Sequence, residues 1–168
     1  IIEHTSANPN GPLHVGRARN PIIGDTVVRI FKAAGFDVES QFYVDDMGKQ
    51  VAILMWGVNN LNPDNVEKPK SDKSDHKNVG FYQLASKLME ENIKISQEIS
   101  EIVKKIEQGD KKTFSLVKKA YTPVLEGIKE SLKRININID RYIPESEFVK
   151  DKSVDFVVEK LKHLKYCN

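Results

Sequence analysis

Residues 7–17 read Ala-Asn-Pro-Asn-Gly-Pro-Leu-His-Val-Gly-Arg, a rigid polar loop that leads directly into a helical pattern. Its prolines, glycines and asparagines are typical of a loop. From Leu13 onward, apolar residues recur every three or four positions, which predicts an amphipathic helix that ends before Gly35. The apolar pair Ile1-Ile2 predicts the end of a buried strand ahead of the loop.

A second strand is predicted over residues 36–44, where alternating and β-branched residues follow the helix. Strand, loop, helix and strand in this order form a βαβ unit, and such units build parallel sheets. Pro21 lies inside the helical span and predicts a kink or a restart there. Open α/β sheets bind ligands at the carboxyl ends of their strands, so the loop over 7–17 is the expected site.

The rest of the chain contains helical patterns, one polar stretch and a third apolar alternation. Residues 57–80 are rich in Asn, Pro, Asp and Lys, a composition that fits either a linker or an ordered surface loop. Gly109-Asp110 separate two amphipathic patterns, which predict an antiparallel helical hairpin. The expected elements are helices over 49–56, 81–106, 114–135 (kinked at Pro123) and 151–164, and a strand over 135–139.

These elements predict an α/β fold: half of a nucleotide-binding parallel sheet, interrupted by a helical-hairpin insertion. The expected division is 1–58 for the first part of the sheet domain, 59–134 for the polar linker and insertion, and 135–168 for the return to the sheet. The chain starts within an apolar run, without a Met, and stops just after a helical pattern, so we expect a piece of a longer protein.

Composition limits the classes of function only loosely. A net charge of +2 over 168 residues is too small to indicate nucleic acid or a membrane by itself. The one cysteine, Cys167, excludes an internal disulfide and fits a reducing cytoplasm. No apolar run approaches the length of a membrane span, and we expect no membrane partner.

The loop carries groups suited to phosphate chemistry. The start of the predicted helix offers free N–H groups and a positive dipole end, which together favour an anion. His14 and Arg17 lie about one turn apart there, and Gly16 lets a nucleotide approach the backbone. This pattern predicts nucleotidyl transfer by positioning and charge stabilisation, although so short a motif often occurs by chance.

Three segments carry a family resemblance. HTSANPNGPLHVGRARN (4–20), followed by Gly24-Asp25, resembles the HIGH signature region of class I aminoacyl-tRNA synthetases, in the form typical of arginyl-tRNA synthetases. YVDDMGKQ (43–50) is similar to that family's YVND-x-G-x-Q segment, and Asp140 with Glu145-Ser146 resembles its FD…ES segment. The match does not extend in detail through 60–134. It implies a Rossmann-like sheet of the HIGH-type nucleotidyl transferases.

The resemblance also implies roles for single residues. It implies an intact enzyme that activates L-arginine with ATP and then transfers the arginine to tRNA(Arg). Mg²⁺ is expected to take part, without a metal site formed by the protein. The tRNA is expected to bind mostly through regions outside this chain. The implied arginine-binding residues are Glu3, Ser6, Ala7, Asn8 and Arg17; those for ATP are Pro12, His14, Gly16 and Arg17; the catalytic ones are His14 and Arg17.

The chain departs from the family pattern in two respects. Arg17 stands at the fourth HIGH position, where His is usual; arginine keeps its charge and can clasp phosphate, but cannot give up a proton. Nothing resembles the KMSK loop, the other half of the arginine pocket or the anticodon-binding helices, which are expected after Asn168. We therefore expect this chain alone to be inactive or catalytically poor.

Several residues keep two interpretations. Tyr43, Asp45, Asp46 and Gln50 fit either direct contact with the site or a core tyrosine followed by helix-capping carboxylates. The lysine pairs at 104–105, 111–112 and 118–119 fit solvated faces, or less readily tRNA phosphate contacts. Two other functions remain open: a small HIGH-type nucleotidyltransferase that makes adenylylated cofactors, and a non-enzymatic tRNA-binding module.

Overall fold

The structure is a computed structural model that describes residues 1–164; Cys167 lies outside the described residues. Its strands are β1 (Ile2–Ala7), β2 (Ser40–Val44) and β3 (Arg141–Pro144), in the spatial order β1-β2-β3. Both pairs are parallel, as the βαβ pattern predicts. Alternate residues of β2 are buried, because one face of the strand packs on the core.

Helix α1 (Val15–Ala33) connects β1 to β2. It runs unbroken through Pro21, so the alternative of a restarted helix is wrong. Gly35 follows its end with a positive φ of 88°, as predicted for the stop. The helix lies close on β1 at Gly24, where a Cβ would overlap the ring of His4. Burial lowers the pKa of His4 from 6.5, against a smaller opposing effect of Asp25.

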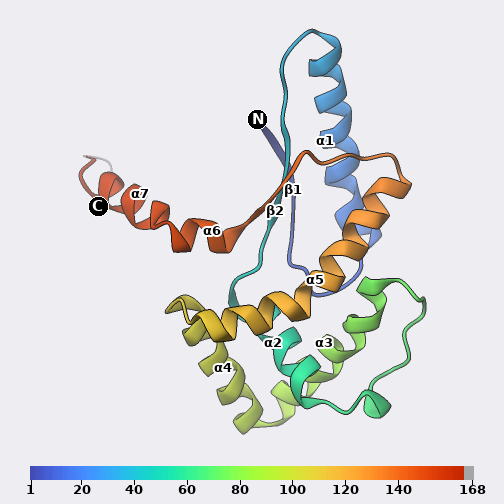
Figure 1. The fold of residues 1–168 in the computed structure, drawn as a ribbon, viewed down its shortest axis with the longest axis vertical. Coiled ribbons are helices and arrows are strands. Elements are labelled where there is room, and N and C mark those ends of the chain that lie inside the picture. The colour runs from blue at the N-terminus through green and yellow to red at the C-terminus, as the bar shows by residue number, and fades with distance from the viewer. Residues whose placement is uncertain (165–168) are drawn as a thin grey trace.

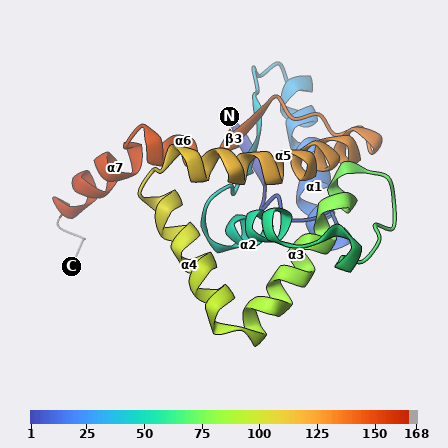
Figure 2. The same ribbon diagram turned by 60° about the horizontal axis from the view of Figure 1, so that its bottom comes forward.

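Four helices gather at the end of the sheet where β1 and β2 finish (Figure 1). They are α2 (Gly48–Asn60), α3 (Ser74–Glu91), α4 (Ile93–Glu107) and α5 (Lys111–Arg134), with a short 3-10 turn over Pro63–Asn65. Figure 2 shows α2 enclosed by the other three helices. Every residue of α2 from Val51 to Gly57 is buried, so this helix forms the centre of the cluster.

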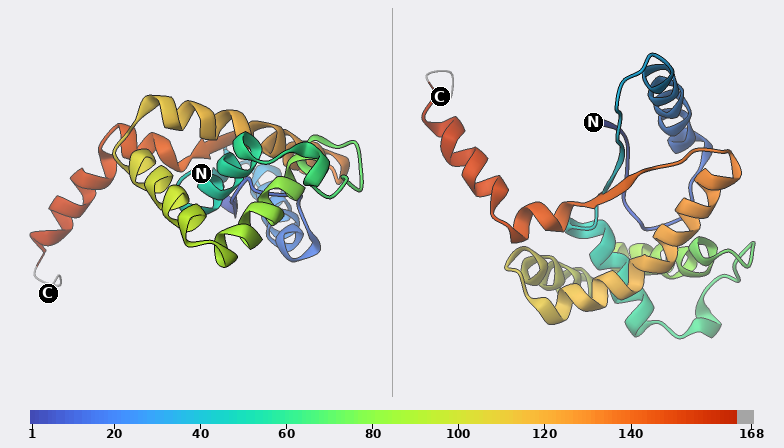
Figure 3. Two further views of the ribbon diagram at one scale, coloured as in Figure 1. Left: turned by 90° about the horizontal axis from the view of Figure 1, so that it is seen from below. Right: turned by 45° about the horizontal axis from the view of Figure 1, so that its top comes forward.

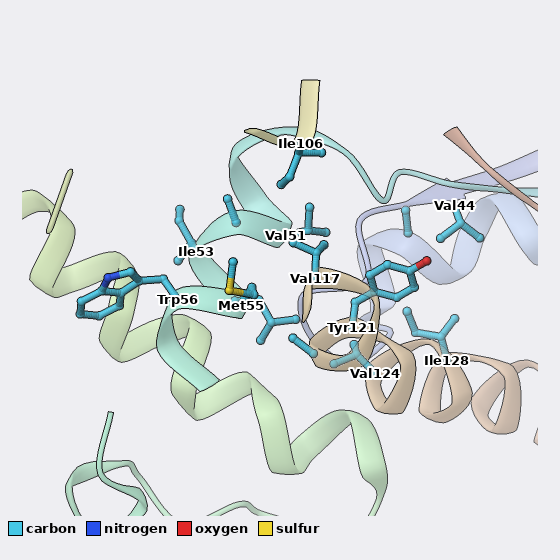
Figure 4. Packing of buried hydrophobic residues seen from close by; sticks show 14 of the residues in the cluster. Val44, Val51, Ile53, Met55, Trp56, Ile106, Val117, Tyr121, Val124 and Ile128 are labelled. Atoms are coloured by element: carbon cyan, nitrogen blue, oxygen red, sulfur yellow. The ribbon is translucent and has the colours of Figure 1, made fainter. Parts of the chain in front are cut away.

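One hydrophobic core joins the sheet to these helices. It includes Phe42 and Val44 of β2, much of α2, and Val117, Val124 and further residues of α5. Figure 4 shows the α2 and α5 side chains interleaved, with the hydroxyl of Tyr121 directed away from Trp56. The core is thus continuous across the proposed boundary at 58/59, and the three-part division of the chain remains a prediction.

The region between α2 and α5 differs from the expected pattern in two places. The single helix predicted over 81–106 is wrong: α3 and α4 are separate helices, because Asn92 breaks the first and caps the second by accepting a hydrogen bond from Lys94 N at 2.9 Å. The stretch 57–80 is ordered in part as helix, since α2 runs to Asn60 and α3 begins at Ser74.

The third strand lies further along the chain than predicted. Residues 135–139 are not a strand, because Asn136 has a positive φ of 58° and Ile137 N bonds back to Leu132 O at the end of α5. Ile137 is buried under that end, so the isoleucine alternation reflects loop packing rather than pairing. The sheet is completed by β3 at 141–144 instead.

The helix predicted over 151–164 is confirmed as α7 (Ser153–Lys162). A further short helix that was not predicted, α6 (Glu145–Lys150), directly follows β3. Lys152 separates them with a left-handed φ of 61°. Figure 3 shows α7 projecting away from the rest of the molecule. Over the described residues, no helix is long and apolar enough to cross a bilayer.

Candidate functional site

The loop of residues 8–14 connects the carboxyl end of β1 to α1, as predicted. His14 is the N-cap residue of α1, and its carbonyl accepts from Arg17 N at 2.8 Å and Ala18 N at 3.1 Å. The imidazole of His14 is exposed and folds toward Gly16, where a Cβ would come within 3.1 Å of it. Because Gly16 has no side chain, the His14 ring can lie beside the start of α1.

Arg17 is tied to the same loop. Its Nη1 donates to the carbonyl of Asn8 at 3.3 Å, so the guanidinium lies beside the loop rather than in open solvent. The Asn8 amide makes a long 3.5 Å contact with the carbonyl of Asp45, which follows β2. The loop, the helix start and the end of β2 are thus brought together at the predicted ligand-binding edge of the sheet.

A cavity of about 260 Å³ opens beside His14 and Arg17. One wall is the loop, and the other is α3 of the insertion. The two walls touch at Gly11, where a Cβ would lie only 3.1 Å from Val79 Cγ2. The lining residues are Asn10, Gly11, Pro12, His14, Arg17, Val79, Tyr82 and Gln83.

Gln50 links this loop to the insertion. Its Oε1 accepts from the amide of Asn10 at 2.5 Å and from the hydroxyl of Tyr82 at 2.5 Å. Asn10 itself is buried, with 8% of its surface exposed. Gln50 therefore holds the loop, a role that neither interpretation of this segment includes.

Asp46 is a buried junction between three segments. Its carboxylate accepts from Ser146 N at 2.9 Å, Ser146 Oγ at 2.9 Å and the Tyr121 hydroxyl at 3.0 Å. The YVDD and ES segments, 100 residues apart in sequence, therefore meet at this carboxylate. Asp46 has no exposed surface, so it stabilises the edge of the site without touching a ligand.

Asp45 and Glu145 line a second, acidic cavity of about 320 Å³ at the ends of β2 and β3, together with Glu107. Burial, with a further contribution from the hydrogen bond to Asp45, raises the pKa of Glu145 to about 7. Burial first, then the charges of Glu145, Asp45 and Glu3, raise the pKa of Tyr43 to about 12. This part of the site therefore has a negative potential.

The residues implied for arginine are spread along β1 and its following loop. Glu3 and Ser6 are exposed, and Ser6 pairs in register with Tyr43. Ala7 is buried in the core, so only its backbone is near the site, where its carbonyl accepts from Asp45 N at 3.2 Å. Glu3, Ser6 and Asn8 thus lie toward the acidic region, and Pro12, His14 and Arg17 line the loop cavity.

Four residues at or behind the site were not singled out from the sequence. Val79 falls within the polar stretch 57–80, and Tyr82 and Gln83 fall in the predicted helix, where no local signal indicates that this face of α3 meets the loop. Tyr121 was assigned only to a helix face, and no local signal shows that its hydroxyl reaches Asp46.

The described residues form no metal-binding group, and the predicted lysine pairs do not lie at the loop. No group of three or more His, Cys, Asp or Glu residues within 1–164 is placed to hold a metal ion. The lysine pairs at 104–105, 111–112 and 118–119 are exposed on α4 and α5, and Lys104 pairs with Glu101 at 2.8 Å. Contact of these lysine pairs with tRNA phosphates stays a prediction, as does their role as solvated faces.

Comparison with known proteins agrees with the sequence resemblance. Residues 1–167 match the family described as tRNA synthetases class I (R), catalytic domain. Arginine–tRNA ligase of Methanocella arvoryzae is 48% identical over 167 residues, which cover 99% of this chain and 30% of the relative. That of Methanothermobacter thermautotrophicus is 44% identical over 166 residues, covering 99% of this chain and 29% of the relative.

A solved structure shows the same fold. Thermus thermophilus arginyl-tRNA synthetase superposes with a TM-score of 0.72 at 25% identity, covering 98% of this chain and 28% of that one. The chain thus spans about 30% of the length of the curated relatives it matches. The predicted fold class and the predicted family are both confirmed: this chain belongs to the catalytic-domain family of the class I arginyl-tRNA synthetases.

Proposed function

We propose that this chain forms part of an arginine–tRNA ligase, which activates L-arginine with ATP and transfers it to tRNA(Arg). The observation that carries the proposal is the placing of His14 and Arg17 at the start of α1, where they line one cavity together with Pro12; Gly16, the fourth residue implied for ATP, does not line it. The acidic region around Asp45 and Glu145 lies next to it and suits a cationic amino acid. The chain thus supplies a cavity suited to the phosphates of ATP and an acidic region suited to the arginine side chain.

In the proposed reaction, the arginine carboxylate attacks the α-phosphorus of ATP, the bond to the β-phosphate breaks, and pyrophosphate leaves. No nucleophile from the protein is needed, so the residues act by position and charge. His14 and Arg17, with the free N–H groups at the start of α1, stabilise the negative charge that develops on the phosphates. Glu3, Ser6 and Asn8, with the backbone at Ala7, hold the amino acid.

Arg17 supports charge stabilisation rather than proton transfer. Arginine is poorly suited to giving up a proton, and the bond to the Asn8 carbonyl holds the guanidinium beside the loop where we propose that the phosphates bind. In this position it holds the loop and can also meet a phosphate oxygen with its remaining N–H groups.

We further propose that Mg²⁺ enters with ATP and that the enzyme works in the cytoplasm. Mg²⁺ commonly binds through substrate phosphates with few protein ligands. The ion would supply charge neutralisation on the phosphates.

The test is arginine-dependent exchange of pyrophosphate into ATP, and arginylation of tRNA, by the intact synthetase that contains this chain. We expect His14→Ala and Arg17→Ala each to lower kcat about 100- to 1,000-fold, the usual effect of losing one charge-stabilising donor. His163→Ala and Arg134→Ala remove the same side chains from exposed sites at helix ends and serve as controls. Near-normal activity of both site variants would refute the assigned roles.

The 168-residue chain alone is expected to arginylate tRNA poorly, because it spans about 30% of its relatives. Rates near those of ordinary synthetases would overturn this expectation. The match to arginine–tRNA ligases over residues 1–167 favours the synthetase over a small cofactor nucleotidyltransferase. Binding of an acylated cofactor precursor in place of arginine would favour that alternative.

A further inference from the structure

Helix α3 belongs to the insertion, yet it forms one wall of the cavity beside His14 and Arg17. Val79, Tyr82 and Gln83 all line this cavity, and none of them belongs to the HIGH region. Val79 and Tyr82 are three residues apart, so both lie on the face of α3 that meets the loop. A helix in this place can shape the nucleotide site without contributing a charged group.

The position of α3 is closely fixed by its neighbours. At the crossing with α2, a Cβ on Gly57 would lie 2.6 Å from the carbonyl oxygen of Phe81, so the two backbones are in direct contact. On the other side, the Asn78 amide donates to the carbonyl of Ala120 in α5 at 3.0 Å. Tyr82 is therefore held by packing on either side of its own turn, and its hydroxyl has a defined place.

That hydroxyl begins a short chain of hydrogen bonds to the loop. Tyr82 donates to Gln50 Oε1, and the same oxygen accepts from the amide of buried Asn10. Asn10 lies four residues before His14, and its neighbour Gly11 packs directly on Val79. The loop that ends in His14 is thus held at two adjacent residues: Gly11 packs on Val79 of α3, and Asn10 is bonded to Gln50 of α2, which in turn bonds Tyr82.

We propose that Tyr82 is a positioning residue for the nucleotide site, acting through Gln50 on Asn10 and so on the loop that presents His14 and Arg17. The inference rests on the proposed function. Tyr82 also lines the cavity, so its ring limits the space that the nucleotide occupies. Loss of the hydroxyl alone frees the loop while the wall of the cavity keeps its shape.

The test measures pyrophosphate exchange by the intact synthetase and its Tyr82→Phe and Gln50→Ala variants. We expect each variant to raise the KM for ATP about 2- to 10-fold, the range that corresponds to one net hydrogen bond. The KM for arginine is expected to rise less than the KM for ATP, since none of the three residues of this chain of hydrogen bonds lines the acidic cavity. The double variant is expected to resemble the worse single variant, because both changes break one chain of bonds.

Two further variants separate positioning from a general effect on folding. Gln50→Glu keeps oxygen acceptors for both donors and is expected to restore a near-normal KM for ATP. Tyr142→Phe makes the same chemical change on β3, where the ring packs on Phe42, and is expected to leave both KM values unchanged.

Each outcome decides between the two proposals. A wild-type KM for ATP in Tyr82→Phe, additive effects in the double variant, or an equal rise in both KM values would overturn the positioning role and leave the proposed function intact. A wild-type enzyme that exchanges no pyrophosphate with arginine would instead overturn the proposed function, and this inference with it.

Discussion

Replacing Asp46 with alanine should show how strongly the site depends on a buried junction. The carboxylate has no exposed surface and accepts three hydrogen bonds, two from Ser146 and one from Tyr121. Asp46→Ala leaves the Ser146 N–H, the Ser146 hydroxyl and the Tyr121 hydroxyl without this partner. Each unsatisfied group costs about 1–3 kcal/mol, and losing the buried charge offsets part of that sum.

We therefore expect Asp46→Ala to lower the free energy of unfolding by about 2–4 kcal/mol, a large share of the roughly 5–15 kcal/mol typical of a domain. Asp46→Asn keeps one acceptor for Ser146 N and should cost about 1 kcal/mol. Urea unfolding can be followed through the fluorescence of Trp56, the one tryptophan, which lies buried on α2. Asp37→Ala, at an exposed position, is the matched control.

The reasoning would be refuted if Asp46→Ala unfolded within about 0.5 kcal/mol of the Asp37→Ala control, the spread usual for surface substitutions. A Tyr121→Phe variant supplies a second check. Its effect should be smaller in the Asp46→Ala background than in the wild type, because the two side chains share one bond.

Three further changes address stability. The pKa of Glu145 is raised from 4.5 to about 7, so the folded state binds this proton more tightly than the unfolded state, and wild-type stability should fall as the pH rises from 4.5 toward 7. Glu145→Gln cannot ionise and should therefore gain stability relative to the wild type over this range. A difference in urea midpoint between the two proteins that does not change with pH would contradict this. Because burial lowers the pKa of His4, the unfolded chain binds its proton more readily, and wild-type stability should fall as the pH drops below 6.5. The free energy of unfolding of His4→Gln should depend less steeply on pH in this range. Equal pH dependence of the two proteins would exclude His4 as the source. Gly24→Ala places a methyl group into the His4 ring and should cost about 1–3 kcal/mol in thermal or urea unfolding, whereas exposed Asn20→Ala on the same helix should not; equal effects of the two would contradict close packing there.

Local patterns predicted the elements that carry their own signals. The loop before α1, the stop at Gly35 and the return through β2 are marked by residue types with definite backbone preferences. The break at Asn92 is hidden in the sequence, because apolar residues keep helical spacing on both sides of it, at Leu88 and at Ile95. Only the capping bond to Lys94 N distinguishes two helices from one.

The isoleucines at 135, 137 and 139 misled for a related reason. Their alternation is a strand pattern, but burial of Ile137 under α5 produces the same spacing in a loop. At the site, the residues of the HIGH region were recognisable from order and type. The contacts of Asp46 with Ser146 and of Gln50 with Tyr82 depend on the packing of the whole insertion, which no short stretch of sequence encodes.

The spacing of the strands sets an order of events during synthesis. Gln41 of β2 pairs with Arg141 of β3, so 100 residues separate the partners (141 − 41 = 100). At roughly 5–20 residues per second, a ribosome takes about 5–20 s to make that interval. Until then the edge of β2 that β3 covers has no partner strand from this chain. The helices α2 to α5 all lie within this interval, so they are synthesised before β3 can pair with β2.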